Sequence, residues 1–109
     1  MTRFLFAAGF LILTCTAGRA DDFATVRYRC DRGAEVTATY LNIGERSFAV
    51  ISFEGRQLGF ETAATGSGAR YLSTDESGPF VWWTKGSEGA LSFGAKANET
   101  VLHSGCREY

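Results

Sequence analysis

Residues 48–63 read FAVISFEGRQLGFETA, and this stretch decides the fold. Its first six residues form two alternating sets, one for each face of a β-strand, and large apolar side chains occupy both sets. We therefore expect this strand to be covered on both faces. The pair Glu54-Gly55 is a tight-turn signal, and the residues after it place Leu58 and Phe60 on one face of a second strand. The stretch predicts an antiparallel β-hairpin.

Short strands of the same kind continue on both sides of this hairpin, separated by glycine and small polar turns. No window shows sustained apolar residues at helical spacing. The predicted strands are residues 26–30, 36–40, 48–53, 56–63, 69–73, 80–85, 90–93 and 99–103. An open sheet of about eight strands would leave free edges and an exposed apolar face, so it should close on itself. The sequence therefore predicts an all-β fold, a small antiparallel barrel of about eight strands.

Residues 1–20 have the three parts of a secretory signal peptide: Arg3, an apolar run over residues 4–13, and small residues that end at Ala20. The apolar run is about half of the roughly 20 residues that a membrane-spanning helix needs. We therefore expect export and cleavage after Ala20, which leaves residues 21–109 as one small domain. The leader holds two of the 11 basic residues and none of the 12 acidic ones, so its removal changes the formal net charge from −1 to −3. A mildly acidic surface gives no footprint for nucleic acid, and it suits a basic protein partner.

Within the leader, residues 12–15 read ILTC and resemble a bacterial lipoprotein box, in which the cysteine is lipidated and becomes the new N-terminus. Thr14 departs from the glycine, alanine or serine that usually precedes that cysteine. Two forms therefore stay open: a soluble periplasmic or secreted protein, and a protein anchored to the outer membrane through Cys15.

Cys30 and Cys106 are the pair of cysteines that remains near the two ends of the domain. In an exported chain such a pair is expected to form a disulfide. This bond would close a loop of about 76 residues and would contribute roughly 4 to 5 kcal/mol by chain-entropy reasoning. Metal binding by the two cysteines is the alternative, but the single histidine and the absence of paired-cysteine spacing disfavour it.

Residues that could act in catalysis are few. The only histidine, His103, follows a strand and has no nucleophile motif such as G-x-S-x-G near it. The adjacent carboxylates Asp21-Asp22 and Asp75-Glu76 lie in a tail and a turn, where solvation explains them. Gly66-Ser67-Gly68 lacks the lysine and the helix of a phosphate-binding loop. The sequence indicates no enzyme, no metal site and no cofactor.

Two polar motifs stand at the ends of neighbouring aromatic-rich strands: SGARY at residues 67–71 and WTKG at residues 83–86. Together they resemble the two recurrent motifs of the membrane-bound and periplasmic inhibitors of c-type lysozyme, which read approximately S-G-x-x-Y and W-x-K-G. The motifs stand in the family's order and are followed by a strand and a final cysteine. The resemblance therefore covers most of the chain, from about Tyr28 to Cys106.

The resemblance implies a closed β-barrel that inhibits c-type lysozyme, a basic protein, without being an enzyme. In the family the motif serine and lysine reach the catalytic acids of the target, and these roles carry over to Ser67 and Lys85. A retaining lysozyme uses two carboxylates about 5 Å apart, and a hydroxyl and an ammonium can satisfy them without offering a glycosidic bond to break. Gly68 and Gly86 would permit close backbone approach. The other expected site residues are Tyr71 and Trp83, which would brace the strands, and Arg70, Trp82 and Thr84, which would be rim contacts.

Other interpretations stay open beside inhibition. Both motifs can be ordinary turns with a solvated lysine. The domain could also be a small ligand-binding barrel with an open, aromatic-lined mouth, which a cavity of several hundred cubic ångströms would favour and a barrel filled by its own side chains would exclude. A structural envelope lipoprotein is the third interpretation. The stretch between Tyr71 and Trp83 is longer than expected for the family, so a loop over residues 72–79 either adds contacts or moves Lys85 out of reach.

Overall fold

The structure is a computed structural model, and it describes residues 22–63, 66–74, 79–94 and 98–109. The predicted leader and Cys15 lie outside the described residues, so cleavage after Ala20 and lipidation stay predictions. Within the four described ranges, no helix has both the length and the apolar character needed to cross a membrane.

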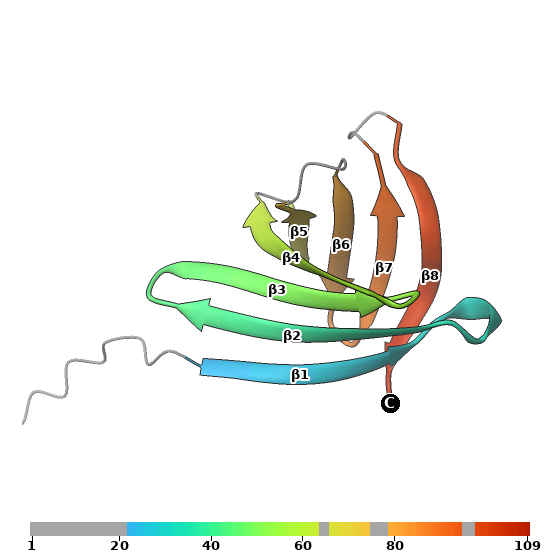
Figure 1. Cartoon of the computed structure of the whole chain (residues 1–109), viewed down its shortest axis with the longest axis horizontal. Helices are drawn as coiled ribbons and strands as arrows, with labels where there is room; N and C mark the ends of the chain where they lie inside the picture. Colours follow the sequence, from blue (N-terminus) through green and yellow to red (C-terminus); the bar gives the residue numbers. More distant parts are fainter. Residues whose placement is uncertain (1–21, 64–65, 75–78, 95–97) are drawn as a thin grey trace, which may run out of the picture.

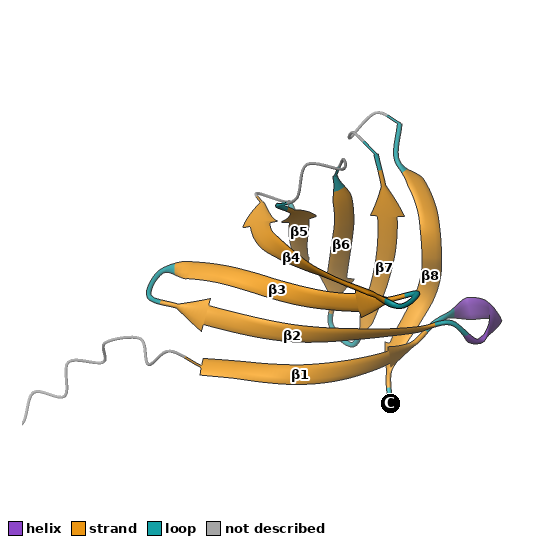
Figure 2. Ribbon diagram, in the orientation of Figure 1, coloured by secondary structure: helices purple, strands orange, loops and turns teal. Residues whose placement is uncertain are grey.

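In the described part of the chain, eight antiparallel strands form one closed barrel in chain order (Figures 1 and 2). The strands are β1 (Asp22–Arg29), β2 (Glu35–Ile43), β3 (Arg46–Phe53), β4 (Arg56–Ala63), β5 (Ala69–Ser73), β6 (Phe80–Lys85), β7 (Glu88–Phe93) and β8 (Thr100–Glu108). A single turn of 3-10 helix, η1 (Asp31–Gly33), connects β1 to β2. Figure 1 shows β1, β2 and β3 running across the direction of β6, β7 and β8, so the sheet curls as it closes. The predicted all-β barrel is confirmed.

The hairpin predicted from residues 48–63 is present as β3 and β4, with Phe53 paired to Arg56. The two turn residues have positive φ angles, 48° at Glu54 and 75° at Gly55, as a type I′ turn requires. Alternate residues of β3 are buried inside the barrel, and most of those between them are half-buried. This strand is therefore covered on both faces, as its sequence predicted.

Side chains fill the barrel interior. The largest buried ones, each at most 2% exposed, are Trp82, Tyr28, Phe60, Ile51, Leu91 and Val36. The Trp82 ring packs edge-on against Tyr28 with ring centroids 5.0 Å apart. Gly89 on β7 makes room for this indole, because a Cβ atom at that position would lie 2.7 Å from it. The packed interior argues against a ligand cavity inside the barrel.

The polar ends of the interior aromatic side chains form a hydrogen-bonded chain. Trp82 Nε1 donates to the Tyr40 hydroxyl over 2.9 Å, and the Tyr40 and Tyr28 hydroxyls lie 2.7 Å apart. Burial raises the pKa of Tyr28 and Tyr40 above the usual value of a phenol, and it does the same for Tyr71, whose ring lies 5.7 Å from that of Tyr40. The three phenols are therefore held neutral in the folded protein.

These phenols predict a loss of stability in alkaline solution. In the unfolded chain they ionise near pH 10, whereas the folded protein holds their protons to higher pH. Their contribution to stability is complete below about pH 10 and is lost as the pH rises through the folded-state pKa values. We expect the free energy of unfolding, measured in urea, to fall between pH 10 and pH 12 in step with tyrosinate absorbance. A Tyr40→Phe variant should show a shallower fall; an equal slope would contradict this explanation.

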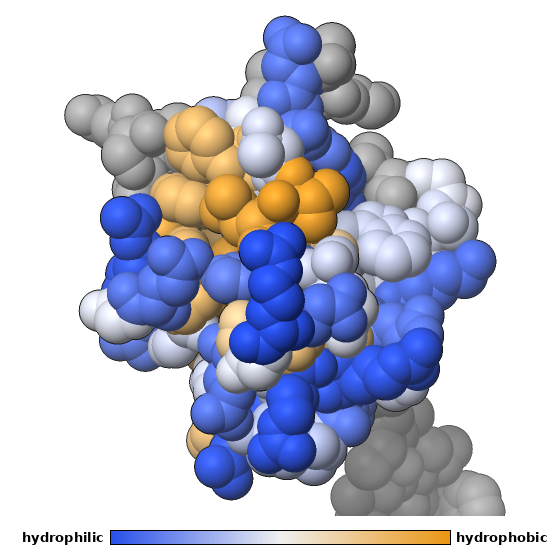
Figure 3. Space-filling model, turned by 90° about the vertical axis from the view of Figure 1, so that its right-hand side faces the viewer, coloured by the Kyte–Doolittle hydropathy of each residue, from blue (hydrophilic) through white to orange (hydrophobic). Residues whose placement is uncertain are grey.

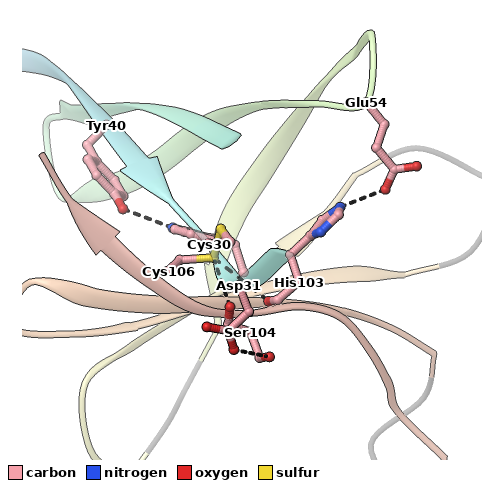
Figure 4. Close-up of a disulfide and its surroundings, with 8 residues drawn as sticks. Cys30, Asp31, Tyr40, Glu54, His103, Ser104 and Cys106 are labelled. Atoms are coloured by element: carbon pink, nitrogen blue, oxygen red, sulfur yellow. Dashed lines mark hydrogen bonds and ion pairs between the residues drawn. A yellow bond between two sulfur atoms is a disulfide. The ribbon is translucent and has the colours of Figure 1, made fainter. Parts of the chain in front are cut away.

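The barrel closes at a short seam between its first and last strands. Only Tyr28 and Arg29 of β1 pair with β8 in the described structure. Beside this seam the Cys30–Cys106 disulfide joins residues 76 positions apart, with Cα atoms 3.8 Å apart, closer than the about 4.4 to 6.8 Å usual for such bonds (Figure 4). The predicted pairing of the two cysteines is confirmed, and it ties together the strands that the seam holds only briefly.

The last strand differs from the sequence prediction. Residues 99–103 were expected to form it, whereas β8 runs from Thr100 to Glu108 and passes through Cys106. Gly105 makes this possible, since it adopts a φ of 62° where a Cβ atom would lie 2.4 Å from the Asp31 carboxylate. That carboxylate accepts a hydrogen bond from the Ser104 hydroxyl (Figure 4). A glycine that reads as a turn signal is here a point where η1 packs against a continuing strand.

Candidate functional site

The two polar motifs lie side by side because β5 and β6 are paired. The register sets Ala69 opposite Thr84 and Arg70 opposite Trp83. The chain just before β5 therefore reaches the end of β6, and Ser67 and Lys85 are both exposed at this edge of the barrel. A hydroxyl and an ammonium from separate parts of the sequence thus emerge together, as the sequence predicted.

Gly68 fixes how closely the two motifs approach. Its φ is 69°, and a Cβ atom built on it would lie 2.3 Å from the Thr84 carbonyl oxygen and 3.3 Å from the Lys85 Cβ. The Trp83 indole holds the same loop from the side, since its Nε1 donates to the Ser67 carbonyl over 3.3 Å. The loop that carries Ser67 therefore packs directly on the backbone that carries Lys85.

We expect Gly68→Ala to destabilise the domain by about 1 to 3 kcal/mol, because alanine must adopt a left-handed φ and push away a backbone carbonyl. Urea unfolding measures the effect. Gly66→Ala is the matched control, since its Cβ atom would meet nothing within 4 Å and no left-handed φ is required there. Equal stability of the two variants would show that the contact with Thr84 does not restrain the loop.

Lys85 ends β6 at a two-residue turn to β7. Gly86 has a φ of 61° and open space around the position of a Cβ atom, which suits the first position of a type II′ hairpin turn. The register sets Lys85 opposite Glu88, whose carboxylate pairs with Arg107 over 2.8 Å. Among the residues that the structure describes, Lys85 forms no ion pair. Its ammonium is therefore available to a carboxylate from another molecule.

Some of the other predicted site residues lie at the surface of this edge, and others are buried beneath it. Thr84 and Trp83 are half-buried at the edge, and Arg70 pairs with Glu99, which directly precedes β8. Tyr71 is only 9% exposed, and Trp82 is fully buried. Trp82 is therefore not a rim contact as predicted, since its β6 position points into the barrel, and Tyr71 can act only as the brace that the sequence suggested.

The connection between β5 and β6 does not displace Lys85. Residues 72 and 73 belong to β5, with Leu72 paired to Val81, so the expected loop over residues 72–79 is shorter than predicted. Residues 75–78 lie outside the described part of the chain. The pairing next to them keeps the WTKG motif in register with the SGARY motif.

His103 lies away from this edge. Its Nε2 is 2.7 Å from a Glu54 carboxylate oxygen, so the imidazole links β8 to the β3–β4 turn (Figure 4). The contact gives this histidine a structural role between the two elements. Within the described ranges, no group of three histidine, cysteine or acidic side chains could hold a metal ion.

Two of these side-chain contacts between strands could not be predicted from the sequence. Arg70 and Glu99 are 29 residues apart, and His103 and Glu54 are 49 residues apart. A charged residue on a strand carries no information about a partner that another strand supplies. Only the closed barrel brings these pairs together.

Comparison with known proteins identifies the family. The family described as membrane-bound lysozyme-inhibitor of c-type lysozyme matches residues 28–100. The chain belongs to this family. The match includes both polar motifs and all of β2 to β7.

Two relatives named membrane-bound lysozyme inhibitor of C-type lysozyme support the assignment. The one from Pseudomonas aeruginosa is 35% identical over 88 residues, covering 80% of this chain and 66% of the relative. The one from Cupriavidus necator is 37% identical over 73 residues, covering 67% of this chain and 55% of the relative. This member of the inhibitor family thus spans about two thirds or less of the length of these relatives. Their names describe inhibitors and not enzymes.

Two solved structures of lysozyme inhibitors share the fold. Pseudomonas aeruginosa MliC, in complex with hen egg white lysozyme, superposes with a TM-score of 0.64 at 32% identity, covering 83% of this chain and 85% of that one. PliC from Salmonella typhimurium, a periplasmic lysozyme inhibitor of C-type lysozyme, superposes with a TM-score of 0.71 at 21% identity, covering 81% and 99%. At that lower identity the second likeness concerns the fold alone.

Proposed function

We propose that this domain inhibits a c-type lysozyme by placing the edge that carries Ser67 and Lys85 into the active-site cleft of the enzyme. The observation that carries the proposal is the β5–β6 pairing, which presents both polar motifs at one exposed edge. The related Pseudomonas aeruginosa inhibitor has been captured in complex with hen egg white lysozyme. Membership of the family and the geometry of this edge point to the same target.

The chemistry of the edge suits a cleft with two carboxylates. A retaining lysozyme holds its acid and its nucleophile about 5 Å apart. The Lys85 ammonium can donate to one carboxylate and the Ser67 hydroxyl to the other, and such charge-assisted hydrogen bonds are stronger in a cleft that excludes water. Neither donor offers a glycosidic bond, so the enzyme is occupied without turnover.

The remaining site residues would support this contact. Gly86 leaves open space beside Lys85 for the walls of the cleft. Trp83 and Gly68 hold the Ser67 loop, and Thr84 and Arg70 lie at or next to the same edge. The acidic balance of residues 21–109 favours encounter with a basic enzyme.

We further propose that the protein acts in the periplasm, either free or anchored through Cys15. The mass of the mature N-terminus distinguishes the two forms. An unlipidated chain that starts at Asp21 would remove the anchor, and a lipid-modified Cys15 would establish it.

The inhibition assay tests the proposed function. The protein is exported to the periplasm of the expression host, purified with its disulfide formed and added to hen egg white lysozyme that is clearing a suspension of cell walls. We expect clearing to stop at an equimolar ratio. Unchanged clearing at a several-fold excess of folded protein would overturn the proposal.

A further inference from the structure

A groove of about 510 Å³ lies at the other end of β6 from Lys85. It is lined by Phe53, Phe80, Phe93 and Leu102, with Arg56 and Glu54 at its polar side. Figure 3, which views the molecule from the side of β8, shows apolar side chains gathered on this face beside hydrophilic ones. The volume is within the range of about 300 to 1,000 Å³ that is usual for small-molecule sites.

The apolar wall of the groove is aromatic and continuous. The ring centroids of Phe53 and Phe80 are 5.2 Å apart, and those of Phe80 and Phe93 are 4.8 Å apart. Phe80 and Phe53 are buried, whereas Phe93 is 36% exposed, so the wall runs from the core to the surface. Another aromatic ring can extend this series at the same spacing of about 4.5 to 7 Å.

Arg56 places a cation at the groove. The Arg56 guanidinium lies 5.9 Å from the Phe53 ring centroid and 5.6 Å from that of Phe80. In the described part of the chain, this guanidinium has no carboxylate partner, unlike those of Arg46, Arg70 and Arg107. The Glu54 carboxylate is already paired with His103. A cation above an aromatic wall is thus left to bind an anionic group of a ligand.

We propose that this groove binds a small aromatic carboxylate, with its ring against the phenylalanines and its carboxylate on Arg56. This site is separate from the proposed lysozyme contact. Phe80 and Lys85 stand at opposite ends of β6, which places them about 17 Å apart at the rise of a β-strand. The barrel interior is packed, so the site belongs to the surface at one mouth of the barrel and is no internal carrier cavity.

The test titrates 1-naphthoate into the exported, disulfide-bonded protein and follows its backbone amide resonances. We expect saturable shifts confined to residues around the groove. Arg56→Gln should weaken binding about tenfold or more, because it removes the charged partner of the carboxylate. Arg27→Gln is the matched control: it removes a guanidinium that also lies over an aromatic ring, that of Tyr109, outside the groove, and it should change affinity less than about twofold.

Further variants and ligands make the proposal specific. Phe93→Ala should weaken naphthoate binding while the backbone amide spectrum stays native. Lys85→Ala should leave naphthoate binding unchanged, even if this variant no longer inhibits lysozyme. The neutral 1-naphthamide should bind about tenfold more weakly than 1-naphthoate. The proposal would be overturned by the absence of saturable binding, by equal binding of decanoate, or by equal losses of affinity in the Arg56 and Arg27 variants. A dimer that is detected by sedimentation and that covers the groove with its contact surface would also overturn it.

Discussion

Lys85→Ala is expected to weaken inhibition of a c-type lysozyme about 30-fold or more. Lys85 is exposed at the edge of the barrel, and among the described residues it has no ion pair to give up when it meets a carboxylate. Removing one partner from a desolvated charge pair costs about 2 kcal/mol or more, and each 1.4 kcal/mol or so is a factor of about ten in affinity. The apparent inhibition constant against hen egg white lysozyme measures the effect.

Arg29→Gln is the matched control for this variant. Arg29 is exposed at the end of β1, next to Arg107 at the same end of the barrel. Among the described residues it forms no ion pair, so its removal leaves the Glu88–Arg107 pair beside Lys85 intact. Both substitutions remove one positive charge from that region, so their effects on long-range attraction should be similar. Equal losses would mean that net charge, and not a specific contact of the ammonium, explains inhibition. Ser67→Ala should weaken inhibition less than Lys85→Ala does, because a neutral hydroxyl forms a weaker hydrogen bond to a carboxylate than an ammonium does.

Removal of the Cys30–Cys106 disulfide is expected to lower the free energy of unfolding by about 4 to 5 kcal/mol, the chain-entropy value for a loop of this length. Folded domains are typically stable by only about 5 to 15 kcal/mol, so the loss should be large. The Cys30→Ala, Cys106→Ala double variant, unfolded in urea, measures it. Amide hydrogen exchange should rise first at Tyr28 and Arg29, because these residues form the seam with β8.

Reduced wild-type protein separates the crosslink from the packing of the two sulfur atoms. Cys106 is fully buried, so alanine there also removes core volume. Reduction alone should therefore account for most of the loss, and a reductant should have no effect on the double variant. A loss below about 1 kcal/mol on reduction would show that hydrogen bonding and packing close the barrel without the covalent bond.

The alternation of side chains between the two faces of each predicted strand was sufficient to predict most of this fold. The hairpin of β3 and β4 followed from two alternating runs around Glu54-Gly55. The adjacency of Ser67 and Lys85 followed as well, because consecutive antiparallel strands set the start of one beside the end of the next. The end of β8 did not follow, since the sequence does not show that the strand continues through Gly105 and packs there against Asp31.

Features that depend on several strands were beyond reach of the sequence. The groove takes its phenylalanines from β3, β6 and β7 and its cation from β4. The inward direction of Trp82 depends on the register of β6, and a doublet of tryptophans does not show which one faces the core. The position of these side chains is determined by how the strands pair in the closed sheet. It is not determined by the residues next to them along the chain.

The close packing of Gly68 on the Thr84 carbonyl limits how the proposed inhibitory edge could be adapted to a different target. An insertion or deletion within either motif would slide one strand past the other and separate the two donors by a residue's length. New target preferences should therefore arise by exchange of flanking side chains at constant spacing. Length changes should be tolerated only outside the Ser67–Gly68 and Thr84–Lys85 steps.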